Sequence, residues 1–600
     1  MAIKTAAQSP AAAGGFTRAL RADALETGRP KNAHVDGRHL VLVRAGGAVR
    51  AFDARCPHMG YPLAQGHVED GVLRCDWHHW RFDLATGGCL TFGGVDLPAY
   101  PVREADGWLW VGATPSAPVV QQDPALARVV LERGLRDGAL FPIAKAAAAL
   151  LYQGEAAEGV AAVATAYGAA RTRGFDAAFT ILACLGRALP LLDADERALA
   201  LVHAFRHLAD AVRGRPERPL HPALPALEGD GTADVARLRT LVDERQPAGV
   251  ERILRAALER ADEGVVAEMV LGAATDHVFL STGHVLDEAR QALRLLRWLG
   301  PRAAPGLAGS LLAGVLVDAM DGNRHEEDID WQEALPALSA LDQAMAPEAP
   351  PASGRVVSQE EAEGLLGGGL ADTLAAVDRL RQAGAGVVDL ARALAWAAVE
   401  RQGRFPAQNL EDWNDVHHLV TYANAADALA RRYAGVSPGL GRALMRAVYH
   451  GFGYVALTRY LNRPRARYAW EGGRLPAADA AAFQAALAAH DGERAGALAA
   501  ALALAGAPPD DLEVPYLRSV LREDATFHLY QSVDAALRLA ASWPERPDAR
   551  ARVLSGSVRF VLAQKSQRRV LAATENALRL LRGESLEEDA EGGATARSQG

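Results

Sequence analysis

The character of the sequence changes once, near residue 120, and this change limits the possible folds more than any other feature. Residues 16–114 contain short strand patterns separated by turn signals, such as HLVLVR, AGG and AVRAFD, which are typical of hairpins. After the linker at 114–124, the chain consists of long alanine- and leucine-rich stretches that favour helix. We therefore expect a multidomain chain, with a small all-β sandwich followed by a large all-α region.

Proline and glycine divide the helical region further. The segment MAPEAPPASGRVV separates a first half, 124–345, from a second half, 355–582, and residues 583–600 have the composition of a disordered tail. The sequence shows no fixed-period repeat of the solenoid type. The two halves share one local pattern, in DHVFLSTGH and VHHLVTYAN. Either an ancient duplication or a coincidence between biased sequences would explain it.

Composition excludes several classes of function. With 600 residues and half of them apolar, the chain can bury more than one core, but it has no apolar run of about 18 residues that would span a membrane. The net charge of −9 argues against nucleic acid or an anionic membrane as the main partner. The N-terminus lacks the apolar core of a secretory signal, and four cysteines do not form a disulfide framework. We therefore expect a cytoplasmic protein.

Two of these cysteines are each followed closely by a histidine. Cys56 and His58 form a Cys-x-His pair, and after sixteen residues Cys75 and His78 form a Cys-x-x-His pair. Two thiolates and two imidazoles can hold either zinc or a [2Fe–2S] cluster. The spacing is poor for a zinc finger, which leaves structural zinc as the weaker alternative.

The context of these pairs resembles the Rieske family, in its oxygenase and ferredoxin branch. CPHMGYPLAQG is similar to the first cluster-binding loop of that family, and CDWHHWRFDLATGG with LPAYPVREADGWLWV is similar to its second loop and closing strands. The resemblance covers residues 16–114. It implies a [2Fe–2S] cluster in which Cys56 and Cys75 bind one iron and His58 and His78 bind the other.

The resemblance also implies a reduction potential. High-potential members carry an extra cysteine in each loop and a hydroxyl near the sulfurs, whereas Tyr61, Trp77 and Trp80 occupy those regions here. Fewer hydrogen bonds to the sulfurs imply a low-potential electron-transfer centre. His79 stands where the family usually has glycine. We expect either an ordinary surface side chain or an imidazole that serves proton-coupled electron transfer or docking.

The helical region lacks the iron-binding pattern of ring-hydroxylating oxygenases, Asn-x-x-Asp-x-x-His-x4-His, so the resemblance ends with the first domain. In DHVFLSTGHVLDEA, the side chains of His277, Ser281, His284 and Glu288 fall in one sector of a continuous helix. Histidines and a carboxylate directed into a helical bundle are the components of non-haem iron sites.

Further histidines lie near carboxylates, amides or tyrosines and are candidates of the same kind. They are His203, His207, His417, His418, His450 and His528. From the whole set we expect a second metal site formed by His277, His284, Glu288, His417 and His528.

The function that these patterns predict is that of an oxidoreductase of the Rieske oxygenase type. The cluster is expected to pass electrons from a reductase or ferredoxin to a non-haem iron that activates oxygen and oxidises a small organic substrate. In the alternative, the chain is an electron carrier whose helical region docks a separate oxygenase or reductase and holds no metal. A third possibility is a helical scaffold in which the cluster senses redox state.

Overall fold

The chain folds into two compact units, of which one is mostly β and the other is helical. The computed structural model describes residues 15–92, 95–115, 124–225, 231–260, 263–321, 329–345, 350–405, 412–462, 475–564 and 569–582. The first unit comprises residues 1–156 with 569–600, and the second comprises residues 157–568. The expected fold class, a small β domain followed by a large helical region, is confirmed. The predicted disordered tail at 583–600 lies outside the described residues.

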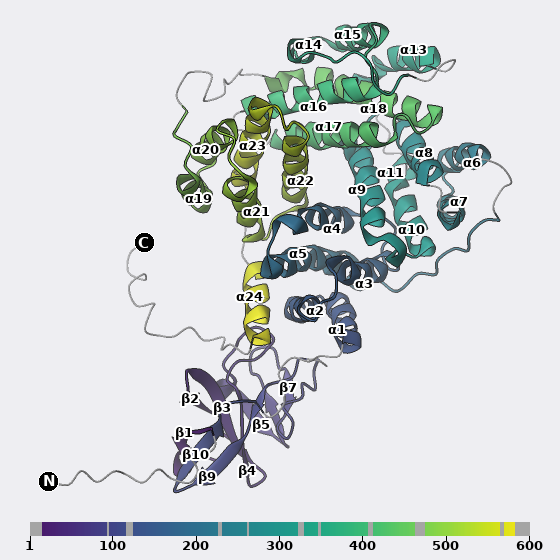
Figure 1. The fold of residues 1–600 in the computed structure, drawn as a ribbon. Helices are drawn as coiled ribbons and strands as arrows, with labels where there is room; N and C mark the ends of the chain where they lie inside the picture. The colour runs from purple at the N-terminus through teal and green to yellow at the C-terminus, as the bar shows by residue number, and fades with distance from the viewer. Residues whose placement is uncertain are drawn as a thin grey trace. The chain divides into compact units, whose positions relative to one another are not determined.

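The β domain contains three small antiparallel sheets (Figure 1). Their strands are β1 (Phe16–Arg21), β2 (Lys31–Val35), β3 (Arg38–Ala45), β4 (Ala48–Asp53), β5 (His67–Glu69), β6 (Val72–Arg74), β7 (Arg81–Asp83), β8 (Ala99–Tyr100), β9 (Val102–Ala105) and β10 (Trp108–Gly112). The strand orders are β1-β10-β9, β2-β3-β4-β8 and β5-β6-β7. Strand alternation directs one face of the first two sheets inward, and their shared core contains Leu40, Leu42, Leu109 and Val111.

Three helices belong to the same unit as the β domain: α1 (Pro124–Asp137), α2 (Leu140–Tyr152) and α24 (Arg569–Leu581). Helix α1 packs on α2, and α2 packs on α24. The Arg133 guanidinium of α1 lies 4.5 Å from the centroid of the Phe92 ring and donates to the Thr91 carbonyl oxygen at 3.0 Å. The β domain therefore forms one unit with three helices whose residues fall in the predicted helical halves 124–345 and 355–582.

The second unit is helical throughout its regular structure. Its helices are α3 (Ala157–Ala169), α4 (Ala177–Ala188), α5 (Ala194–Val212), α6 (Thr232–Asp243), α7 (Pro247–Glu259), α8 (Glu263–Thr275), α9 (His284–Leu299), α10 (Pro305–Val315), α11 (Val317–Asp321), α12 (Ile329–Gln332), α13 (Leu335–Met345), α14 (Gln359–Gly364), α15 (Leu370–Gln382), α16 (Val387–Arg404), α17 (Trp413–Tyr433), α18 (Pro438–Leu457), α19 (Ala480–Ala488), α20 (Gly492–Leu504), α21 (Glu513–Leu521), α22 (Phe527–Ala541) and α23 (Pro547–Leu562). Among the described residues, none of the helices is long and apolar enough to cross a membrane.

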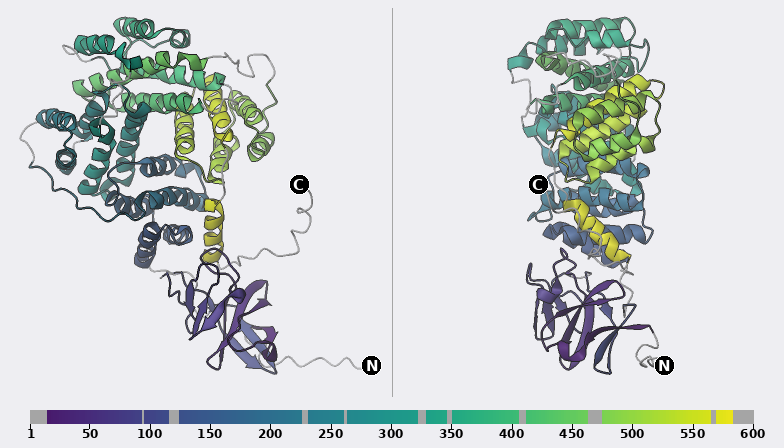
Figure 2. Two further views of the ribbon diagram at one scale, coloured as in Figure 1. Left: turned by 180° about the vertical axis from the view of Figure 1, so that it is seen from behind. Right: turned by 90° about the vertical axis from the view of Figure 1, so that its left-hand side faces the viewer.

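Four helices from distant parts of the sequence form a closed frame inside this unit. Helix α17 contacts both α9 and α22, and α4 contacts the same two helices from the other end. Figures 1 and 2 show α9 and α22 below α17, with α4 beneath them. Side chains on these helices are mostly apolar, because each helix is covered by neighbours on several sides. The polar side chains that do point into the frame are therefore exceptions that require partners.

The expectation of one continuous helix through His277 and His284 is wrong. Helix α8 ends at Thr275 and α9 begins at His284, with a short 3-10 turn at Leu280–Gly283 between them. Phe279, Ser281 and Thr282 all have positive φ, between 44° and 52°. A right-handed helix cannot pass through such residues. His277 therefore does not share a helical face with His284, whereas His284 and Glu288 remain one turn apart on α9.

Candidate metal centres

Two loops of the β domain bring the predicted cluster ligands together. The first loop follows β4, and its Cys56 amide donates to the Tyr61 carbonyl oxygen at 2.9 Å. The second loop joins β6 to β7, and its Cys75 amide donates to the Trp80 carbonyl oxygen at 2.8 Å. Both loops are thus closed by their own backbone, which places one cysteine at the start of each turn.

The cysteines and the histidines of these loops differ in their exposure. The Cys56 and Cys75 side chains are buried, whereas His58 is half-buried and His78 is exposed. The His58 and His78 ring centroids lie 4.5 Å apart, and the His58 ring stacks on Trp80 at 4.6 Å. The buried Nδ1 of His58 has no hydrogen-bond partner. A cluster bound here would have its sulfur ligands inside the domain and its imidazoles toward the surface.

The thiols have the chemistry that a cluster needs. All four cysteines are free, and the Cys56 and Cys75 thiols are hydrogen-bonded to one another. The hydrogen bond from Cys56 lowers the pKa of Cys75 to about 6, and the same bond, with burial, raises the pKa of Cys56. Two adjacent sulfurs, one of them readily deprotonated, together with two neighbouring imidazoles, fit a [2Fe–2S] cluster with mixed ligands.

Comparison with known protein families agrees with this geometry. The sequence model of the Rieske [2Fe-2S] domain matches residues 16–101. Residues 16–101 are a Rieske [2Fe-2S] domain. The domain implies a [2Fe–2S] cluster, and its homologues support electron transfer. No family model matches the rest of the chain.

Two relatives of the Rieske domain are components of oxygenase systems. The chain is 39% identical over 105 residues to the oxygenase subunit of 3-chlorobenzoate-3,4-dioxygenase from Comamonas testosteroni, a match that covers 16% of this chain and 24% of that protein. It is 36% identical over 81 residues to the ferredoxin component of the alkene monooxygenase system of Xanthobacter autotrophicus, covering 13% and 66%. The chain thus spans less than two thirds of the length of these relatives.

A solved structure, the Sphingomonas yanoikuyae B1 ferredoxin, is also similar to the Rieske domain. The identity is 25%, the match covers 16% of this chain and 97% of that chain, and the TM-score is 0.16.

His79, beside the predicted ligand His78, is exposed and has a positive φ of 59°. Its Nδ1 accepts hydrogen bonds from Arg74, at 2.8 Å from Nη2 and 3.3 Å from Nε. A guanidinium has no acceptor atom, so Arg74 is the donor in both contacts. The position that the family usually fills with glycine is therefore occupied by a left-handed histidine fastened to β6.

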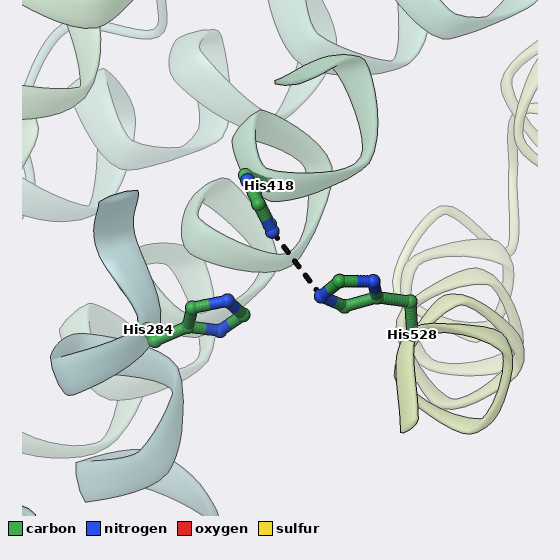
Figure 3. Close-up of side chains that lie close together, drawn as sticks. All are labelled: His284, His418 and His528. Carbon is green, nitrogen blue, oxygen red and sulfur yellow. Dashed lines mark hydrogen bonds between the residues drawn. The ribbon is translucent and has the colours of Figure 1, made fainter. Parts of the chain in front are cut away.

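Outside the Rieske domain, three histidines converge in the frame of the helical unit (Figure 3). His284 opens α9, His418 lies in the second turn of α17, and His528 lies in the first turn of α22. One ligand nitrogen from each lies within 4.8 Å of the other two. The Nε2 atoms of His418 and His528 are 3.3 Å apart. Two ligands bound at about 2.0–2.1 Å in a tetrahedral arrangement around one metal ion lie at about this separation. We call these three residues the histidine triad.

Burial keeps the triad in the neutral form that binds metals. Burial, with a smaller contribution from His528, lowers the pKa of His284 to about 4. Burial also lowers the pKa of His418 to about 3, and that of His528 below its usual value. The buried Nδ1 of His418 has no hydrogen-bond partner. Each of the three residues is nevertheless only partly buried.

The backbone that precedes His284 is strained. Phe279, Ser281 and Thr282 adopt left-handed conformations, and Gly283 follows with φ of 89°. Left-handed backbone at residues with a Cβ costs of order 1–3 kcal/mol each and is typical of functional sites. Here the strained turn places His284 at the N-terminus of α9, which points the imidazole at His418 and His528 (Figure 3).

Behind the triad lies a buried polar network on the same helices. His417 Nε2 is 3.5 Å from Gln531 Oε1, and the Gln531 amide donates to Asp287 Oδ2 at 2.7 Å. Asp534, one turn beyond Gln531, accepts from Arg290 at 3.0 Å and from Arg294 at 2.8 Å. These bonds tie α9, α17 and α22 to one another directly beneath the three histidines. They therefore hold the imidazoles in place.

The structure places the other predicted ligands outside the triad. His277 Nε2 lies 3.4 Å from Asp243 Oδ1 of α6. His417 is fully buried, with its ring stacked on Phe560 at 5.0 Å and 5.1 Å from the His528 ring. Burial, reinforced by the carboxylates of Asp318, Asp287 and Asp176, raises the pKa of Glu288 well above its usual value. This shift favours the protonated form of Glu288, which is a poor metal ligand.

His418 is the triad member that is absent from the predicted second site, although the sequence makes it a candidate. The predicted site contains its neighbour His417 instead, and the two residues point 100° apart on one helix. The orientation of α17 against α9 and α22 decides which of the two reaches the triad. The signal in the sequence was the HH pair itself, which ensures that one imidazole faces inward for a range of helix orientations.

Proposed function

We propose that the chain is an oxidoreductase in which a Rieske cluster supplies electrons to an oxygen-activating non-haem iron bound by the histidine triad, which oxidises a small organic substrate. In this proposal Cys56, His58, Cys75 and His78 hold the cluster. The observation that carries the proposal is the convergence of His284, His418 and His528, three neutral imidazoles from three helices, in a protein that also contains an electron-transfer domain.

The donor set of the triad suits a catalytic rather than a structural metal. Three imidazoles leave further coordination positions for oxygen and for water or substrate. Imidazole ligands suit iron as well as zinc, and the presence of a Rieske domain in the same chain favours the metal that changes its redox state. An iron ion in this position would supply the one-electron chemistry that oxygen reduction needs.

The protein itself contributes ligand orientation and protons to this reaction. The network from Gln531 to Asp287 orients the helices that carry the imidazoles. Glu288 lies one turn from His284 on α9, and burial raises the pKa of its carboxyl group, which favours the protonated form. We infer that this carboxylic acid delivers protons as oxygen is reduced. The electrons enter the cluster from an external reductase or ferredoxin.

The test is the metal content of the purified protein. Protein purified without oxygen should contain iron in excess of acid-labile sulfide, because the cluster contributes both in equal amounts. In His418→Ala the excess should disappear while the cluster spectrum remains. The matched control is His277→Ala, which removes a histidine next to the strained turn but outside the triad and should keep the excess iron.

The second measurement is the rate at which oxygen reoxidises the reduced cluster. With iron in the triad this rate should be high in the wild-type protein and in His277→Ala, and low in His418→Ala. Equal iron and sulfide in the wild-type protein would instead support the alternative function, an electron carrier that docks a separate oxygenase. Zinc in the triad, or reoxidation that does not depend on His418, would contradict the proposal.

A further inference from the structure

A buried tyrosine and a buried histidine form a direct hydrogen bond on the far side of the helix that carries His528. Tyr530, on α22, donates from its hydroxyl to Nδ1 of His203, on α5, at 2.8 Å. The exposed fraction is 1% for Tyr530 and 0% for His203. The two residues are 327 positions apart in the sequence, so the pair exists only in the folded helical unit.

The direction of this hydrogen bond follows from the second contact of His203. Its Nε2 lies 2.8 Å from the carbonyl oxygen of Leu521, which can only accept, so Nε2 carries the proton. Burial lowers the pKa of His203 to about 4, and the ring is therefore neutral. Nδ1 is consequently unprotonated, and the Tyr530 hydroxyl must be the donor.

The surroundings allow a proton to move along this bond. The proton would convert His203 to an imidazolium whose Nε2 still donates to the Leu521 carbonyl. The Asp524 carboxylate favours this charged form, although Arg206, which lies 3.6 Å from Asp524, and His207 oppose it. The phenol therefore has a base in contact and a fixed orientation.

Tyr530 is also close to the histidine triad. His528 and Tyr530 are two residues apart on α22, about 200° around the helix, and a helix with its side chains is about 10–12 Å across. An electron that passes from Tyr530 to a metal bound by His528 therefore crosses about one helix diameter. In the part of the chain that the structure describes, Tyr530 is the residue of α22 whose phenol is hydrogen-bonded to an imidazole.

We propose that Tyr530 and His203 form a proton-coupled redox pair that relays an oxidising equivalent away from the histidine triad. The inference rests on the metal site proposed above. The oxidant is the triad metal after it has reduced oxygen without a substrate to oxidise. Tyr530 loses one electron to that metal, and its phenolic proton moves from Oη to Nδ1 of His203. The products are a neutral tyrosyl radical, an imidazolium and a metal reduced by one electron.

The pair returns to its starting state when an electron from the Rieske cluster reduces the radical and His203 gives the proton back. The relay thereby protects the triad from its own oxidant whenever substrate is missing.

A purely structural role for Tyr530 would require only a hydrogen bond, without a base as the acceptor. Tyr516 makes a hydrogen bond of this structural kind. Its buried hydroxyl meets the hydroxyl of Ser557 at 2.8 Å, and serine is not a base at neutral pH.

The experiment uses the full chain with its iron, reduced under anaerobic conditions and then mixed with oxygen in the absence of substrate. Samples frozen at successive times are measured by electron paramagnetic resonance. We expect an organic-radical signal whose hyperfine structure changes when the protein is made with ring-deuterated tyrosine. Tyr530→Phe, which keeps the ring and removes only the hydroxyl, should lose the signal, and Tyr516→Phe should keep it.

The role of His203 is tested with His203→Gln, which can still accept a hydrogen bond but is not a base. Loss of the radical in this variant, with its circular dichroism unchanged, would support the proton transfer. A radical that persists in Tyr530→Phe would overturn the proposal. Oxidation of the triad iron by oxygen without any tyrosyl signal would overturn this inference alone, whereas a protein without triad iron would overturn the proposed function as well.

Discussion

At the scale of single residues, burial decides the charge of the histidines that line the helical frame. A neutral imidazole is the cheaper form in a protein interior, because the charged form loses its hydration. His203, His284 and His418 all have lowered pKa values, with burial as the largest cause. Folding therefore requires that these side chains give up a proton which the unfolded chain retains in mildly acidic solution.

This proton release predicts a pH dependence that can be assigned to His203. The folded pKa of about 4 lies below the unfolded value of about 6.5, so between these two pH values the unfolded chain binds more protons. The stability contributed by neutral His203 is complete above pH 6.5 and decreases as the pH falls to 4. The total loss is about 3 kcal/mol. Urea unfolding, followed by circular dichroism at a series of pH values, gives the free energy of unfolding of the wild-type protein and of His203→Gln. The loss is the difference between the two proteins in how much this free energy falls between pH 6.5 and pH 4.

The other histidines are present in both proteins, so their contributions to the pH dependence of stability cancel in this comparison. His203→Gln should be less stable than the wild-type protein at pH 7, because Tyr530 loses its preferred acceptor. The gap between the two should narrow toward pH 4.5. Parallel curves of stability against pH would contradict the assignment of a low pKa to His203.

At the scale of secondary structure elements, a close backbone contact joins α10 to the turn that precedes α4. A Cβ added at Gly314 would lie 2.1 Å from the Gly174 Cα and 2.1 Å from the Phe175 backbone nitrogen. Gly174 itself has a φ of 141°, which residues with a Cβ rarely adopt. Because the obstructing atoms belong to the backbone, no side-chain rotation can relieve the clash. Helix α4, one side of the frame around the triad, is thus positioned by a glycine pair.

Gly314→Ala should therefore destabilise the helical unit. Alanine favours helix over glycine by about 1 kcal/mol, but overpacking against fixed backbone costs of order 1–3 kcal/mol and should dominate. Gly272→Ala in α8 is the matched control, since its Cβ would meet only the Arg239 Cδ at 4.0 Å, and it should be neutral or slightly stabilising. Thermal unfolding by circular dichroism compares the two variants. An unchanged midpoint for Gly314→Ala would contradict the close contact.

At the scale of the whole molecule, the chain consists of two compact units, each with its own core. The first unit has the Rieske domain with its three attached helices, and the second contains the histidine triad. Units of this kind are expected to unfold as separate cooperative transitions. The Rieske domain and the histidine triad, the proposed second metal site, therefore belong to different folding units.

We predict that the two transitions can be shifted independently. Loss of the visible absorbance of the cluster reports on the Rieske unit, whereas far-ultraviolet circular dichroism reports mainly on the helical unit. Gly314→Ala should lower the midpoint of the second signal and leave that of the first unchanged. A common shift of both midpoints would show that the units unfold as one.

Features that depend on neighbours along the chain can be predicted from the amino-acid sequence. Strand alternation and turn residues predict the β domain, and the loops with Cys56, His58, Cys75 and His78 are short enough for their spacing to indicate a cluster. Alanine- and leucine-rich composition predicts helices. These features arise from local hydrogen bonding and periodicity, which extend over only a few residues.

The histidines that meet in the helical unit cannot be predicted from the sequence, because their convergence depends on the packing of distant helices. His284, His418 and His528 are separated by more than a hundred positions from one to the next, and no periodicity relates them. Their convergence depends on how α9, α17 and α22 pack, and on a strained turn at Phe279–Gly283 that interrupts the helix expected there. Side-chain packing between distant segments carries that information, and it becomes visible only when the helices are placed in space.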